Sequence, residues 1–106
     1  MARLSINDLE KRIGERASAS AEQSYTRKLL DKGITHCAKK LGEEGVEAAL
    51  AAVAEDRGRM IAETADLLYH LLVVLHARGV KIEEVEVALA ERMARSGLEE
   101  KASRPK

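Results

Sequence analysis

The sequence predicts an all-α fold, an antiparallel four-helix-type bundle, on three observations. Aromatic residues make up only 2% of the 106 residues, with two Tyr and neither Phe nor Trp. The core must therefore be built from aliphatic side chains, which suits packed helices better than a β-sandwich. Proline occurs once, at Pro105, so it interrupts no helix upstream. Apolar residues recur at spacings of three and four along most of the chain, which is the helical period.

Local signals indicate where the first helices begin and end. Ser5 followed by Asp8 predicts the N-terminus of a first helix, which Gly14 is expected to weaken near its end. A loop of small polar residues then leads to a short helix near residues 24–30, ended by Gly33. A long helix is expected from 34 to about 55. Its two internal glycines, Gly42 and Gly45, indicate that another helix or a ligand approaches the backbone there.

A turn expected at residues 56–58 separates this helix from a second long helix over 59–79. Residues 67–75 of that helix are apolar on most sides, so we expect them to lie between layers or at a subunit interface. A last amphipathic helix over 82–97 is expected to direct inward Ile82, Val85, Ala88, Leu89 and Met93. The length predicts a single domain over 1–106, with a polar end at about 97–106 that we expect to be flexible.

Charge and cysteine content exclude several classes of protein. The chain has 18 Lys and Arg against 18 Asp and Glu, so it lacks the global basic field that drives most nucleic-acid binding. The single cysteine, Cys37, cannot form an internal disulfide, which indicates a reducing compartment and a structural thiol. The apolar run at residues 71–75 is much shorter than the ~20 residues of a membrane span. We expect a soluble cytoplasmic protein.

Two acidic strings carry the predicted chemistry, Glu43-Glu44-x-x-Glu47 and Glu63-x-x-Asp66. Carboxylates three residues apart lie about 60° apart on one helix face, and an antiparallel connection allows the two pairs to face each other. Acidic pairs on a solvated face are also common. Facing carboxylates, however, are unfavourable as bare anions and favourable around a hard divalent cation. A magnesium site of this kind indicates phosphate-ester or pyrophosphate chemistry.

Further residues near these strings are candidates for substrate binding. Lys40 shares a helix side with the first acidic string and can neutralise it or contact a phosphate. Tyr25 can stack on a base or ribose, or serve as a core aromatic. His70 is better suited to a substrate than to Mg²⁺, which prefers oxygen ligands, whereas His36 and His76 are interpreted as surface or core residues. The predicted substrate-binding residues are Ser24, Tyr25, Thr26, Arg27, Lys28, Lys40, Tyr69 and His70.

The two acidic strings, sixteen positions apart, resemble the signature of the all-α nucleoside-triphosphate pyrophosphohydrolases. Within that superfamily SYTRKLLDKG, KKLGEEGVEAALAA and ETADLLYHLLVVL resemble the phosphoribosyl-ATP pyrophosphatase family of histidine biosynthesis. The resemblance extends from Leu9 to Arg95. It implies a nucleotide-binding hydrolase that cleaves the α–β phosphoanhydride of 1-(5-phosphoribosyl)-ATP, giving phosphoribosyl-AMP and pyrophosphate.

The resemblance also implies roles for individual residues. Mg²⁺ is expected on Glu44, Glu47, Glu63 and Asp66, and the expected catalytic residues are Glu43, Glu44 and Glu47. Glu43 would support the metal ligands or orient the attacking water, and the general base is not assigned. A homodimer is implied as well, in a stand-alone version without a fused cyclohydrolase domain. Two alternatives stay open: a house-cleaning pyrophosphohydrolase of nucleoside triphosphates, and a non-enzymatic helical dimerisation module.

Overall fold

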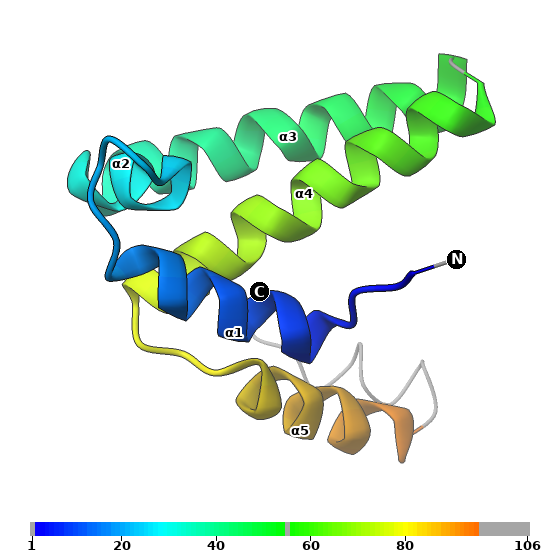
Figure 1. Cartoon of the computed structure of the whole chain (residues 1–106). Coiled ribbons are helices and arrows are strands. Elements are labelled where there is room, and N and C mark those ends of the chain that lie inside the picture. The colour runs from blue at the N-terminus through cyan, green and yellow to red at the C-terminus, as the bar shows by residue number, and fades with distance from the viewer. Residues whose placement is uncertain (1, 55, 96–106) are drawn as a thin grey trace.

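The structure, a computed structural model, describes residues 2–54 and 56–95, and over these residues it contains five helices and no β-strand. The all-α class predicted from the sequence is therefore confirmed. The predicted flexible end at 97–106 lies outside the described residues. The helices, shown in Figure 1, are α1 Ile6–Ala17, α2 Tyr25–Asp31, α3 Ile34–Ala54, α4 Arg57–Ala77 and α5 Ile82–Met93.

The long helices α3 and α4 form an antiparallel hairpin, which is the most extensive helix pair of the protein (Figure 1). Helix α1 packs against α4, α2 lies beside α1 and the start of α3, and α5 contacts α1. The radius of gyration is 15.9 Å, whereas a compact domain of this length has a value of about 13 Å. The protomer is therefore elongated, because only one part of the hairpin is covered by the other helices.

The core lies where α1, α2, α3 and α4 meet. Its fully buried members are Ile13, Leu29, Cys37, Leu72 and Val73, each at most 3% exposed. Cys37 donates a hydrogen bond from Sγ to the carbonyl oxygen of Leu29 at 3.2 Å, which ties α3 to α2. Burial raises the pKa of the Cys37 thiol above its usual value. The thiol therefore stays protonated and packs as a small apolar side chain, as its isolated position in the sequence suggests.

The predicted start of α1 is confirmed, but the extent of the turn expected before α4 is wrong. Ser5 Oγ accepts from the Asp8 amide at 3.1 Å, while the Asp8 carboxylate accepts from the Ser5 amide at 3.3 Å. Helix α1 continues through Gly14 to Ala17, because the packing of its apolar face outweighs the ~1 kcal/mol cost of an internal glycine. The expected turn at 56–58 is shorter, since Asp56 caps α4 by accepting from the Arg59 amide at 2.9 Å.

The expectations for α5 and for the α3 glycines also need correction. Ile82 packs against the core, but α5 has no buried residue, and Leu89 and Met93 are 51% and 79% exposed. One protomer offers α5 only a small contact with α1. A Cβ added at Gly42 would meet nothing within 4 Å, and at Gly45 it would lie at an ordinary 3.9 Å from Leu67. Neither glycine is needed for close packing within the protomer.

By length and composition, helix α4 is long and apolar enough to cross a membrane. A search for uninterrupted runs of apolar residues does not detect this property. The interior helix of a soluble protein meets the same criterion. Here α4 carries the buried polar side chains of Glu63 and His70 and packs against both α3 and α1. The charged residue argues against a membrane span, because a charged side chain within a lipid bilayer is costly.

We predict opposite stability changes for alanine at two glycines. Gly33 has a φ of +93°, in the left-handed region, so Gly33→Ala should lower the free energy of unfolding by about 1–2 kcal/mol. Gly14 lies inside α1 with open space where a Cβ would project, so Gly14→Ala should raise it by about 0.5–1 kcal/mol. Urea denaturation of both variants and the wild type measures these changes. Shifts of the same sign would contradict the assigned conformations.

Candidate active site

Three carboxylates from the two long helices form a single group. Glu44 projects from α3, and Glu63 and Asp66 project from α4, with one oxygen of each lying within 4.8 Å of the others. Glu63 is buried at 5% exposure, Glu44 is partly buried and Asp66 is exposed. The antiparallel hairpin therefore brings together residues from both acidic strings. The group is buried on one side and open to solvent on the other.

Glu63 lies in the most unusual electrostatic environment of the group. Burial raises the pKa of its carboxyl above the usual value; Arg59 opposes this effect, and the neighbouring carboxylates of Glu47, Asp66 and Glu44 add to it. Arg59 Nη2 lies 2.6 Å from Glu63 Oε1, one helical turn away. A divalent cation on this group would favour the charged form of every carboxylate. The all-oxygen donor set, with one buried member, thus fits a hard cation such as Mg²⁺ or Mn²⁺.

The other two predicted carboxylates lie beside this group. Glu47 is one turn beyond Glu44 on α3 and acts on the pKa of Glu63, but it is exposed and is not a member of the group of three. Glu43 lies 3.5 Å from Lys40 Nζ, with its side chain half exposed. The metal and catalytic roles expected of these five carboxylates stay predictions.

An aromatic cluster connects the carboxylates to α2. His70 is buried, and its Nε2 lies 3.8 Å from Glu44 Oε1. Burial lowers the pKa of His70 more than Glu44 raises it, so the imidazole is neutral near pH 7 and the contact is polar rather than ionic. The ring of Tyr69 meets the ring of His70 edge-on, with 5.1 Å between their centroids, and stacks on the ring of Tyr25, with 6.3 Å between their centroids. Tyr25 is 55% exposed and meets His70 edge-on.

The polar groups around Tyr25 anchor helix α2. Ser24 Oγ accepts from the Arg27 amide at 3.1 Å and donates to the carbonyl oxygen of Arg16 at 3.0 Å. The buried hydroxyl of Thr26 hydrogen-bonds to the Tyr69 hydroxyl at 2.6 Å. The Arg27 guanidinium donates to Asp31 at 2.8 Å and to the carbonyl oxygen of Ala17 at 2.9 Å. These contacts fix the position of Tyr25, and direct substrate binding by Ser24, Thr26 and Arg27 stays a prediction.

A cavity of about 480 Å³ opens where α2 meets the start of α3. Three predicted substrate-binding residues line it, namely Tyr25, Lys28 and Lys40. Sequence reasoning missed two further basic residues of its lining, Lys32 and His36. The available signal was the spacing of His36, Lys40 and Glu44, which recur every four residues and share one side of α3. It also missed Arg59, whose signal was its position one turn before Glu63.

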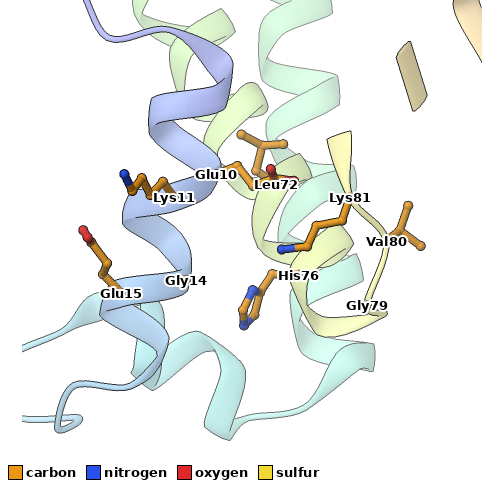
Figure 2. A pocket seen from close by; sticks show the side chains of 9 residues that line it. All are labelled: Glu10, Lys11, Gly14, Glu15, Leu72, His76, Gly79, Val80 and Lys81. Atoms are coloured by element: carbon orange, nitrogen blue, oxygen red, sulfur yellow. The ribbon is translucent and has the colours of Figure 1, made fainter. Parts of the chain in front are cut away.

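A second and larger cavity of about 580 Å³ lies between α1, the end of α4 and the connection to α5, as Figure 2 shows. Its lining includes Glu10, Lys11, His76 and Lys81 but none of the three grouped carboxylates. Glu10 accepts a hydrogen bond from the Ile82 amide at 2.7 Å, so it fixes the start of α5. Volume alone therefore does not identify the functional site, and the grouped carboxylates with the adjoining basic cavity are the better candidate.

The fold and this site define a class of protein: an all-α protein with a group of three carboxylates close to a cavity lined by basic residues. Residues 6–93 match the family described as phosphoribosyl-ATP pyrophosphohydrolase. The chain is 62% identical over 104 residues to phosphoribosyl-ATP pyrophosphatase 1 of Rhodopseudomonas palustris, covering 98% of this chain and 97% of that one. It is 64% identical to the protein of the same name from Bradyrhizobium diazoefficiens, covering 98% of each. The chain belongs to the phosphoribosyl-ATP pyrophosphohydrolase family.

We predict energetic coupling between Thr26 and Tyr69. Tyr69→Phe leaves the buried Thr26 hydroxyl without its partner and should lower the free energy of unfolding by about 1–3 kcal/mol. Thr26→Val should do the same, while the double variant should cost clearly less than the sum, because no unpaired hydroxyl is left. Urea denaturation of the four proteins gives the coupling energy. Additive effects would show that the hydrogen bond does not stabilise the α2–α4 contact.

Proposed function

We propose that this chain hydrolyses 1-(5-phosphoribosyl)-ATP to 1-(5-phosphoribosyl)-AMP and pyrophosphate, the second step of L-histidine biosynthesis. One observation carries the proposal: three carboxylates of the α3–α4 hairpin lie within 4.8 Å of one another. The family supplies the substrate, since relatives 62% and 64% identical over nearly the whole chain are named phosphoribosyl-ATP pyrophosphatase. The basic cavity beside the carboxylates suits a substrate that carries several phosphates.

In this proposal Glu44, Glu63 and Asp66 would hold Mg²⁺, together with the nearby Glu47. Bound Mg²⁺ neutralises phosphate charge and favours attack on the α–β anhydride. Arg59 holds the Glu63 carboxylate in position through the 2.6 Å contact. An open, partly exposed group suits Mg²⁺, which retains water ligands and is bound through a few carboxylates plus substrate phosphates.

The remaining residues bind and orient the substrate. Lys40 stands one turn before Glu44 and contacts the polyphosphate as a point charge. Glu43, 3.5 Å from Lys40, orients the attacking water. The exposed ring of Tyr25 is available to stack on the adenine base, and the neutral His70 imidazole can donate a hydrogen bond beside Glu44.

We also propose that the protein works as a soluble cytoplasmic homodimer. Three residues on one side of α3, Val46, Leu50 and Val53, are 60%, 59% and 88% exposed. On α4, Ile61 and Leu68 are 58% and 36% exposed. An apolar face of this kind on two adjacent helices is typical of an interface between subunits. A second copy of the chain would cover this face and complete the helical bundle.

Metal binding by the carboxylate group is directly measurable without substrate. We expect Mg²⁺ or Mn²⁺ to raise the melting temperature of the wild type, because a ligand that binds only the folded state stabilises it. The increase should disappear in Glu63→Gln and in Asp66→Asn. It should persist in the matched control Glu91→Gln, which changes an exposed carboxylate on α5. Equal increases in all four proteins would place the cation elsewhere.

Pyrophosphate release tests the reaction itself. With Mg²⁺ and phosphoribosyl-ATP, Glu63→Gln and Asp66→Asn should lose ~100-fold or more of kcat/KM, since each removes a direct ligand. Glu91→Gln should retain wild-type activity. The wild type should prefer phosphoribosyl-ATP to dUTP and dCTP. A preference for the deoxynucleotides would favour the house-cleaning alternative, and unchanged activity in the ligand variants would refute the proposed site.

A further inference from the structure

The cavity at the junction of α2 and α3 is lined by more basic side chains than the one, Lys40, that is assigned to the polyphosphate. Four basic side chains line it: Lys28 and Lys32, one turn apart at the end of α2, and His36 and Lys40, one turn apart on α3. The acidic residue of the lining, Asp31, pairs with Arg27 at 2.8 Å, so it does not neutralise the lysines. Lys40 pairs with Glu43, whereas the structure shows no ion pair for Lys28 or Lys32 among the described residues.

Residues on one side of α3 lead from the cavity to the carboxylate group. His36, Lys40 and Glu44 follow one another at four-residue intervals along one side of α3. At 1.5 Å per residue, His36 stands about 12 Å along the helix axis from Glu44. The ring of Tyr25 lines the cavity and also meets His70, which lies 3.8 Å from Glu44. The contacting rings of Tyr25 and His70 therefore connect the cavity lining to the carboxylates.

We propose that Lys28, Lys32 and His36 form a second phosphate subsite, which binds the terminal phosphomonoester of the phosphoribosyl group. The inference rests on the proposed function, since that substrate carries a phosphate at each end of its nucleoside. In this arrangement the polyphosphate occupies the carboxylates and Lys40. The phosphate that reaches Lys32 and His36 must then lie beyond the base. The first turn of α3 contains no acidic residue, and the N-terminus of this helix adds positive potential at this end.

This subsite would give the enzyme its selectivity. A nucleoside triphosphate without a phosphoribosyl group fills the carboxylate end and leaves the lysines at the far end without an anion. The phosphoribosyl phosphate gains charge-assisted contacts there, which are stronger than neutral hydrogen bonds. Lys28, Lys32 and His36 are therefore specificity-determining residues, whereas the grouped carboxylates act on either kind of substrate.

Binding of two nucleotides that differ only in the phosphoribosyl group tests the subsite. Isothermal titration calorimetry with Mg²⁺ compares phosphoribosyl-AMP with AMP on the wild type and on Lys32→Met/His36→Gln. We expect the wild type to bind phosphoribosyl-AMP at least about tenfold more tightly than AMP. The double variant should lose this advantage and bind AMP with unchanged affinity. The matched control is Lys39→Met, which removes one positive charge from α3 at a position outside the cavity lining. This control should still bind phosphoribosyl-AMP more tightly than AMP.

The outcomes separate the subsite from the proposed reaction. Equal affinity of the wild type for the two nucleotides, or an unchanged advantage in the double variant, would overturn the subsite even if phosphoribosyl-ATP is hydrolysed. An equal loss in Lys39→Met would also overturn it, because the effect would then be a general one of charge. If the wild type fails to hydrolyse phosphoribosyl-ATP, the proposed function falls. A phosphoribosyl advantage that depends on Lys32 and His36 would still support the subsite in that case. Circular-dichroism melting curves confirm that each variant is folded.

Discussion

The burial of the Glu63 carboxylate among other carboxylates is the physical constraint on which the rest of the structure depends. This carboxylate is buried between two helices and repelled by the neighbouring carboxylates of Glu44, Glu47 and Asp66. Such an arrangement is unfavourable without a compensating positive charge. Arg59 supplies part of that charge through a 2.6 Å contact, and a divalent cation would supply the rest. The antiparallel α3–α4 hairpin is the element that brings these carboxylates together.

The other helices hold the hairpin at one end and leave the rest of it open. Ile13, Leu29, Cys37 and Val73 join α1 to α4 in a small buried core. The Thr26–Tyr69 hydrogen bond and the stacked tyrosines fix α2 against α4, which places Tyr25 beside His70. Beyond this core, apolar residues of α3 and α4 remain exposed, which explains both the elongated protomer and its expected need for a second copy.

The neutral total charge of the chain conceals a strong segregation. Acidic groups gather in the middle of the hairpin, and basic groups gather where α2 meets α3; the contacting rings of Tyr25 and His70 connect the two regions. A hard cation suits the first region and phosphates suit the second. A substrate with negative charge at both ends of an aromatic base matches this order along α3. Family membership and local chemistry thus support the same reaction.

The sequence by itself determined the all-α class, the capped start of α1 and the side of each long helix that carries carboxylates, because helical periodicity and capping depend on nearby residues. It also predicted Tyr25, Lys28 and Lys40 as neighbours of the acidic strings. Only the tertiary structure decided that Glu44, Glu63 and Asp66 form the closest group while Glu47 lies outside it. It likewise decided that Ser24 and Arg27 anchor α2, that Lys32 and His36 complete a basic cavity, and that Leu89 and Met93 face outward. These outcomes depend on how separate helices rotate and cross, which no local pattern encodes.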